Sequence, residues 1–200
     1  MPVISPQELL NRMRSDMPWS QRIVVDPQFE IPVEVSTASA SIDIHLGNRF
    51  NILHRRRDIE HDPLAPEADV ATEEFFVSFG DKFPLHPGHL VLGTTLEWFR
   101  FPLDLMADVV GRSIWGRRGL LIASATAIQP GSAGTITLEL SNLGEIPVSL
   151  TPGVSIGQLF FHMVEPPLRS DSKLTSFSGF LRPTLGHYKE SEIEKFLLTV

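Results

Sequence analysis

One acid stands among hydroxyl-bearing side chains in the segment from Thr135 to Ser141, which reads TITLELS. Aliphatic and polar side chains alternate along this segment. Because successive side chains of a strand point to opposite faces, the pattern predicts a strand whose polar face carries Glu139. A carboxylate is a residue type that general acid–base chemistry uses. A solvated strand face is the alternative interpretation of a lone glutamate.

A group of basic residues precedes this segment. Arg112, Arg117 and Arg118 lie close together in the run GRSIWGRRGL. Guanidinium groups bind phosphates through paired N–H donors, so these residues could bind a phosphorylated ligand. The formal net charge of −7 argues against general nucleic-acid binding, and such a ligand would need this local basic patch.

The composition of the chain excludes several classes of protein. At 200 residues and 42% hydrophobic content, one globular domain spanning residues 1–200 is expected. The absence of cysteine excludes disulfides, a thiolate nucleophile and the zinc site of the common cytidine deaminases. No apolar run approaches the ~20 residues of a membrane span, and the N-terminus lacks a signal-peptide pattern. We therefore expect a cytoplasmic protein without a membrane partner.

Local patterns predict one short helix and many strands. Ser5 at the N-cap, Pro6 at the first helical position and Glu8 in a capping box predict a helix over residues 5–14 that packs on the core. The run from Ser41 to Leu46 alternates, with its aliphatic side chains on one face.

Turn signals complete the fold class. Pro87-Gly88 and Pro152-Gly153 each predict a tight turn followed by a short apolar strand. Repeated strand–turn–strand units, with 16 prolines and 14 glycines, favour a compact β-barrel or jelly-roll. Residues 54–69 form a polar segment with Arg55, Arg56 and Arg57, which is typical of a solvated loop; phosphate binding is the alternative. The seven histidines do not fall at metal-ligand spacing, so no protein-held metal site is predicted.

Four segments together carry a resemblance to a known family. They are FPLHPGHLVLGTTLE from Phe83, GRSIWGRRGL from Gly111, QPGSAGTITLELSN from Gln129 and PGVSIGQL from Pro152. Weaker similarity covers Ala40 to Ile44 and Ser178 to Thr184. In this order and at these spacings the chain resembles the dCTP deaminases, which belong to a superfamily with the trimeric dUTPases.

The resemblance implies a mainly β fold: a distorted β-barrel or jelly-roll of the dUTPase-like type, with short N- and C-terminal helices and a catalytic core of about residues 36–165. It implies conversion of dCTP to dUTP and ammonia by metal-independent attack of water at cytosine C4, which supplies dUTP for dTMP synthesis. Glu139 matches the catalytic carboxylate, and Ser113 and Arg117 match residues that hold the water and stabilise developing charge.

The resemblance also implies how the substrate binds and how the chain assembles. Mg²⁺ accompanies the triphosphate, no zinc is involved, and family members are homotrimers whose sites lie at subunit boundaries. Gly111 and Gly119 let the backbone approach the ligand. The substrate-binding positions are Arg112, Arg118, Gln129, Gly131, Gln158 and Thr184.

Several positions depart from the family pattern. Ile114 replaces a serine, Gln129 replaces the aspartate expected at the sugar, and Ser132 replaces an aromatic residue. The space that this aromatic residue leaves is either open or filled by Phe180 or Trp115. The segment from Ile122 to Ile128 is also about one residue shorter than the corresponding loop of the family, and it lacks the histidine of that loop. Three functions therefore remain open: a dCTP deaminase, a dUTP diphosphatase or bifunctional deaminase/diphosphatase, and a weakly active nucleotide-binding regulator.

Overall fold

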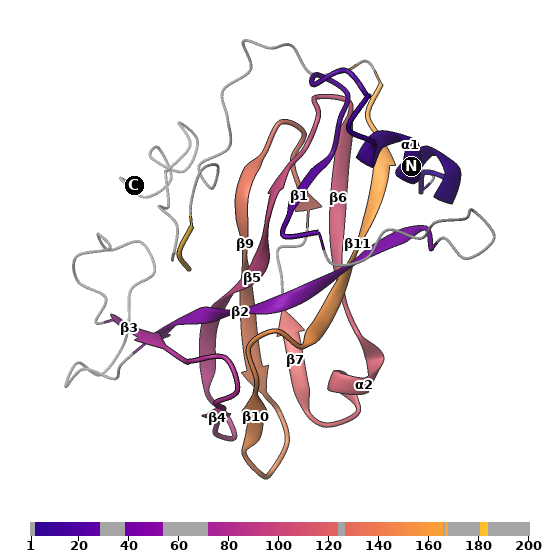
Figure 1. Ribbon diagram of the computed structural model, residues 1–200. Coiled ribbons are helices and arrows are strands. Elements are labelled where there is room, and N and C mark those ends of the chain that lie inside the picture. Colours follow the sequence, from indigo (N-terminus) through magenta and orange to yellow (C-terminus); the bar gives the residue numbers. More distant parts are fainter. Residues whose placement is uncertain are drawn as a thin grey trace, which may run out of the picture.

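The computed structural model describes residues 3–28, 39–53, 72–123, 127–165, 167 and 181–183. Strands make up most of this part of the chain (Figure 1). The predicted loop at residues 54–69, the predicted C-terminal helix, Phe180 and Thr184 lie outside the described residues.

Two short helices and eleven strands are present in the described ranges. The helices are α1 (Pro6–Met13) and α2 (Ser113–Gly116). The strands are β1 (Val24–Asp26), β2 (Ser41–Leu53), β3 (Thr72–Phe76), β4 (Phe83–Leu85), β5 (Leu90–Arg100), β6 (Leu105–Gly111), β7 (Leu120–Ala123), β8 (Ala127–Ile128), β9 (Ala133–Asn142), β10 (Val148–Leu150) and β11 (Ser155–Met163).

One curled sheet dominates the described part of the molecule. Its strands follow the order β7-β9-β5-β2-β11-β6-β8, with β1 paired to β5 and β3 paired to β2. In Figure 1 the long strand β2 runs diagonally across the sheet. The sheet curls back on itself, so that β6 and β7 lie close together although they are far apart in the strand order. A Cβ built on Gly111 of β6 would lie 3.3 Å from Cδ1 of Ile122 on β7. The predicted mainly β, barrel-like fold is confirmed.

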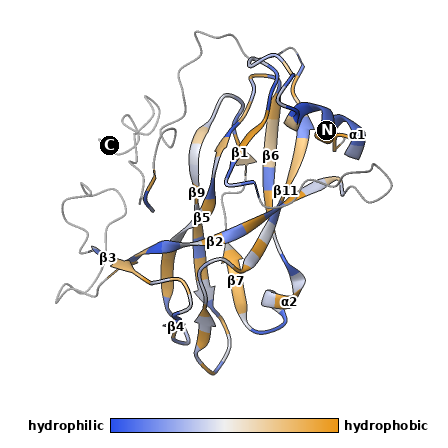
Figure 2. Cartoon of the chain, in the orientation of Figure 1, coloured by the Kyte–Doolittle hydropathy of each residue, from blue (hydrophilic) through white to orange (hydrophobic). Residues whose placement is uncertain are grey.

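Alternating side chains place the core inside this curled sheet. On β2, Ile44 and Leu46 are fully buried, and on β9 Leu138 and Leu140 are fully buried, as their spacing predicts. Figure 2 shows that the strands carry most of the hydrophobic residues, whereas α1 is largely hydrophilic. The largest fully buried side chains include Phe50, which stacks on Phe83 at a centroid distance of 5.3 Å.

The predicted N-terminal helix is confirmed as α1. The Ser5 side chain accepts a hydrogen bond from the backbone N–H of Glu8 at 3.2 Å, and Pro6 opens the first turn. Leu9 is buried, so the helix packs on the core as expected. The Glu8 carboxylate pairs with Arg12, which also donates to Asp104 at 2.8 Å and so ties α1 to the loop between β5 and β6.

The two predicted Pro-Gly turns lie at opposite ends of a short antiparallel ladder, because each turn follows one of its two strands. Gly88 and Gly153 have φ values of 72° and 86°, the left-handed conformation that glycine adopts readily. The strands before them, β4 and β10, form a separate two-stranded sheet. The strands that follow, β5 and β11, are long, so the prediction of short strands after these turns was wrong.

No helix in the described residues is long and apolar enough to span a membrane.

Candidate active site

Helix α2 and the turn after it carry the basic residues. Strand β6 ends at Gly111, and the chain then folds into a single helical turn that the sequence did not predict. The indole N–H of Trp115 donates to the carbonyl oxygen of Ser155 at 2.9 Å and fixes α2 against the start of β11. Ser113, Arg117 and Arg118 are exposed to solvent.

Tight backbone packing explains the glycine that ends this turn. Gly119 has a φ of 86°, and a Cβ there would lie 2.9 Å from the backbone N and Cα of Gly144. Asn142 is fully buried beneath this contact, and its Oδ1 accepts from the Gly144 N–H at 2.9 Å. The fold itself therefore requires glycine at position 119. This structural reason stands beside the expected role in ligand approach, which remains a prediction.

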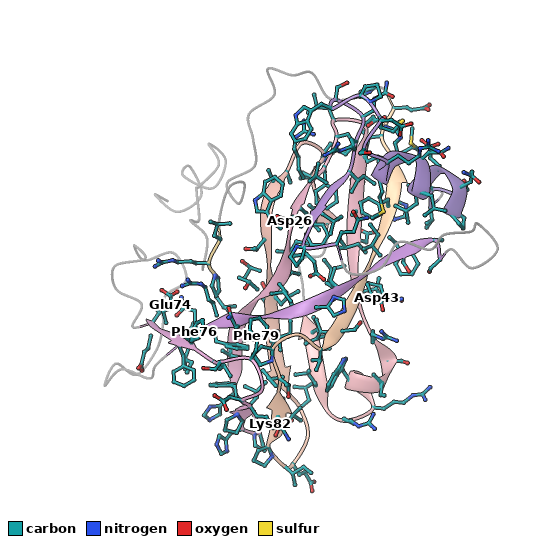
Figure 3. All side chains as sticks on the ribbon, in the orientation of Figure 1. Asp26, Asp43, Glu74, Phe76, Phe79 and Lys82 are labelled. Carbon is teal, nitrogen blue, oxygen red and sulfur yellow. The ribbon has the colours of Figure 1, made fainter. Side chains whose placement is uncertain are left out.

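A polar network connects Arg112 to strands β2 and β11. Arg112 Nη1 donates to Asp43 Oδ2 and to Ser155 Oγ, each at 2.8 Å. Gln158 Nε2 donates to the other carboxylate oxygen of Asp43 at 2.8 Å. The structure thus brings together two of the predicted substrate-binding residues, Arg112 and Gln158, around an aspartate that the sequence analysis did not single out. Figure 3 labels Asp43 on β2.

Glu139 lies on the outer face of the sheet, on β9. Along its own strand the neighbours on that face are the hydroxyl-bearing residues that the alternation predicts, Thr137 and Ser141. Across the sheet, however, its direct neighbours are apolar: Leu92 on β5 and Ala123 on β7. Glu139 is half-buried, and its carboxylate makes no hydrogen bond or ion pair within the described residues.

Two exposed apolar side chains lie near Glu139 on the same face. Leu90 and Leu121 each pair with Ser141 across the neighbouring strands, and they are 44% and 45% exposed. Val110 at the end of β6 and Ile114 in α2 are similarly exposed. Exposed apolar groups of this kind gather where a protein meets a ligand or another subunit.

Gln129 and Gly131 lie at the opposite end of β9. Gly131 has a φ of 77°, and its N–H donates to the carbonyl of Pro102 at 3.2 Å, in the loop between β5 and β6. Gln129 is exposed on the same turn. The seven residues of strand from Ala133 to Glu139 span about 20 Å. Within one chain, the predicted sugar-binding residues are therefore distant from the predicted base.

Among the described residues, the side chains predicted to do chemistry make no direct polar contact with one another. No hydrogen bond or ion pair links Glu139 to Ser113 or Arg117 within the described residues. Trp115 binds Ser155 near the Gly111 end of β6, whereas Ser132 lies by the Leu105 end, where its carbonyl accepts from the Phe101 N–H. Trp115 of the same chain therefore does not fill the space beside Ser132.

One buried carboxylate was also missed by the sequence analysis. Glu97 on β5 is 1% exposed and accepts from the backbone N–H of His45 and from its Nδ1. The sequence did offer a signal for Asp43 and for His45, the partner of Glu97. The alternation over residues 41–46 places both side chains on the polar face of β2. Their partners could not be inferred, because they come from strands distant in the sequence.

The described residues contain no group of three or more His, Cys, Asp or Glu side chains placed to hold a metal ion. Arginine and serine side chains dominate the neighbourhood of α2, and these suit phosphate oxygens better than a bare cation.

Comparisons with known proteins connect this arrangement to a family. A family model described as dCTP deaminase-like matches residues 3–164. A "dCTP deaminase, dUMP-forming" of Halobacterium salinarum is 40% identical over 167 residues, which cover 82% of each chain. A protein of the same name from Mycobacterium ulcerans is 42% identical over 168 residues, 82% of this chain and 86% of that one.

A solved structure shows the same fold at low sequence identity. The 2'-deoxycytidine 5'-triphosphate deaminase of Agrobacterium tumefaciens is similar over 81% of this chain and 48% of its own, with a TM-score of 0.57 and 17% identity. This chain thus spans about half the length of that one. The family model and the relatives cover the basic turn at α2, strand β9 and the glycine-rich turn before β11. The chain belongs to the dCTP deaminase-like family.

Proposed function

We propose that the protein is a dCTP deaminase, which converts dCTP and water to dUTP and ammonia. The observation that carries this proposal is the family match over residues 3–164, a range that contains both Glu139 and the basic turn at α2. Relatives about 40% identical over most of the chain are named dCTP deaminase.

Glu139 is the base in this proposal. Its carboxylate takes a proton from water, the resulting hydroxide adds to C4 of cytosine, and Glu139 passes that proton to N3. Glu139 then takes the proton of the C4 hydroxyl and gives it to the amino group, which leaves as ammonia while the C4 carbonyl forms.

Ser113 and Arg117 hold the water and stabilise the charge that develops at C4. Both are exposed and have no side-chain partner among the described residues, so their donors remain available. A guanidinium placed where negative charge develops contributes several kcal/mol to a transition state, by the reasoning that applies to oxyanion holes.

The remaining predicted residues bind the rest of the nucleotide. Arg112 and Arg118 contact the triphosphate, which enters with its own Mg²⁺ as part of the substrate. Gln129 and Gly131 face the sugar. Gln158 and Thr184 complete the set; Thr184 lies outside the described residues.

The same geometry favours a homotrimer. Within one chain the base and the sugar-binding turn lie at opposite ends of β9, so a complete site needs residues from neighbouring copies. The exposed Leu90 and Leu121 beside Glu139 supply apolar surface that a neighbouring copy would cover. In this assembly α2 of one copy meets the outer face of β9 of another.

A second candidate is a bifunctional enzyme that also cleaves the triphosphate to give dUMP. The names of the relatives favour it, since several are called dUMP-forming. Gln129 opposes it, because the family aspartate at this position orients the water that attacks phosphorus, and a neutral amide cannot serve as a base.

Product analysis separates the candidates. The purified protein is incubated with Mg²⁺ and dCTP, CTP, dCMP or dUTP, and ammonia, dUTP, dUMP and pyrophosphate are quantified. Ammonia and dUTP from dCTP are the expected products. Ammonia with dUMP and pyrophosphate would support the bifunctional enzyme. Binding of dCTP without any product would indicate a nucleotide-binding regulator and would refute the deaminase.

A further inference from the structure

Asp43 lies at the centre of the polar network at the Gly111 end of β6. The network spans three adjacent strands, since Gln158 on β11 pairs with Asp43 on β2 and with Val110 on β6. Asp43 Oδ2 accepts from Arg112 Nη1 at 2.8 Å and from Ser155 Oγ at 3.2 Å, and its Oδ1 accepts from Gln158. Both carboxylate oxygens are therefore engaged.

The ion pair at the centre of this network contributes little to folding. The side chains of Arg112 and Asp43 are 41% and 42% exposed, and exposed ion pairs add little to stability because water screens them. The buried arginine of the same chain offers a contrast: Arg12 is 8% exposed where it pairs with Asp104. The arrangement around Asp43 is better explained by the orientation that it gives to the side chains of Arg112 and Gln158.

The network holds Arg112 through one nitrogen. Nη1 alone contacts Asp43 and Ser155, while Nη2 and Nε have no partner within the described residues. A guanidinium fixed at one end presents its other donors in a set direction, and this lowers the entropy lost when it binds a phosphate. Gln158 is held in the same way through Nε2, which leaves its carbonyl oxygen as an acceptor.

We propose that Asp43 is a positioning residue for nucleotide binding: it orients Arg112 toward the triphosphate and orients Gln158 beside it. The inference rests on the proposed function, in which Arg112 contacts the triphosphate. Asp43 itself does not touch the substrate and acts through Arg112. Ser155 supports the same orientation, because its hydroxyl contacts both members of the ion pair.

A double-mutant cycle tests this role. The four proteins are the wild type, Asp43→Asn, Arg112→Ala and the double variant, and the Kd for Mg²⁺-dCTP, the KM, the kcat and the Tm are measured for each. Asp16→Asn is the matched control, since Asp16 forms an exposed ion pair with Arg14 at 2.9 Å in the segment after α1.

The expected result is specific to binding. Asp43→Asn raises the Kd and KM about three- to tenfold, the loss that corresponds to ordering one long side chain on binding. The kcat and the Tm stay close to those of the wild type. In the Arg112→Ala background the same substitution has almost no further effect on Kd, because the side chain that Asp43 orients is gone.

Three results would overturn the inference. Equal losses in both backgrounds would show that Asp43 does not act through Arg112. Tighter dCTP binding by Asp43→Asn would show that the carboxylate repels the triphosphate. A lower Tm with unchanged KM would show a structural role alone. If the wild type binds dCTP but releases no ammonia, the proposed function fails, while the Kd cycle still decides the role of Asp43.

Discussion

Replacing Glu139 by glutamine tests the proposed base with little disturbance to the sheet. Glutamine has nearly the same shape and keeps hydrogen-bonding capacity, but it cannot accept a proton from water at ordinary pH. The backbone pairing of Glu139 with Leu92 and Ala123 does not involve the side chain, so β9 should remain in place. We therefore expect the variant to fold, to assemble and to bind dCTP.

The size of the loss follows from the role of the carboxylate. General acid–base groups contribute typically ~10²–10⁴ in rate, which corresponds to about 3–5 kcal/mol of transition-state stabilisation. In the proposed mechanism Glu139 handles several proton transfers, and the described part of its strand has no neighbouring carboxylate that could replace it. We expect kcat for ammonia release to fall by at least ~10² while the Kd for dCTP changes by less than about threefold.

Glu145→Gln is the matched control for this experiment. Glu145 is exposed in the turn between β9 and β10 and is not one of the proposed site residues, so the variant has the same change in net charge without removing the base. Ammonia release is followed in steady state, and nucleotide binding is followed by calorimetry. A Glu139→Gln protein with near wild-type kcat would refute the role of Glu139 as the base. A protein that loses binding and turnover together would place Glu139 in substrate binding instead.

Three further predictions concern assembly, stability and products. Light scattering should show a homotrimer at micromolar concentration; a fully active monomer would contradict a site built from neighbouring copies. Glu97→Ala should lower stability by about 3 kcal/mol, and the Tm by about 6–12 °C, because it removes the buried acceptor of the His45 N–H, whereas the exposed Glu74→Ala should change the Tm little. Because Gln129 cannot act as a base, dUMP formation from dUTP should be negligible, and rapid dUMP formation would show that another residue is the base. Ser132 should leave poorer discrimination of dCTP from CTP than an aromatic residue gives, and a strict preference for the deoxynucleotide would show that another side chain excludes the ribose.

Local patterns in the sequence were sufficient for the elements they specify. The Ser5 cap, the alternation along β9 and the Pro-Gly turn at Gly153 each depend on neighbouring residues, and the structure confirms all three. The helical turn α2 was missed, since a four-residue helix is too short to show a periodic pattern.

Long-range partners explain most of what the sequence could not reveal. Asp43 contacts Arg112 and Gln158 across sequence separations of 69 and 115 residues, and no local pattern encodes such contacts. The apolar neighbours of Glu139 come from β5 and β7, so the polar face expected along β9 becomes a mixed surface in the sheet.

Some positions have a structural reason that the resemblance alone did not suggest. Gly119 packs against the backbone of Gly144, and this contact would require glycine whatever the ligand. The roles of Ser113, Arg117 and Glu139 remain predictions, because they depend on where a bound nucleotide lies.

The proposed attack of water at C4 can be traced through its oxygen atom. A single turnover with Mg²⁺-dCTP in water enriched in oxygen-18, followed by mass spectrometry of the nucleotide and of any released phosphate, shows where that oxygen is incorporated. We predict one labelled oxygen in the uracil base of dUTP, together with one ammonia for each nucleotide converted. Label in dUMP phosphate or pyrophosphate, with an unlabelled base, would contradict the account.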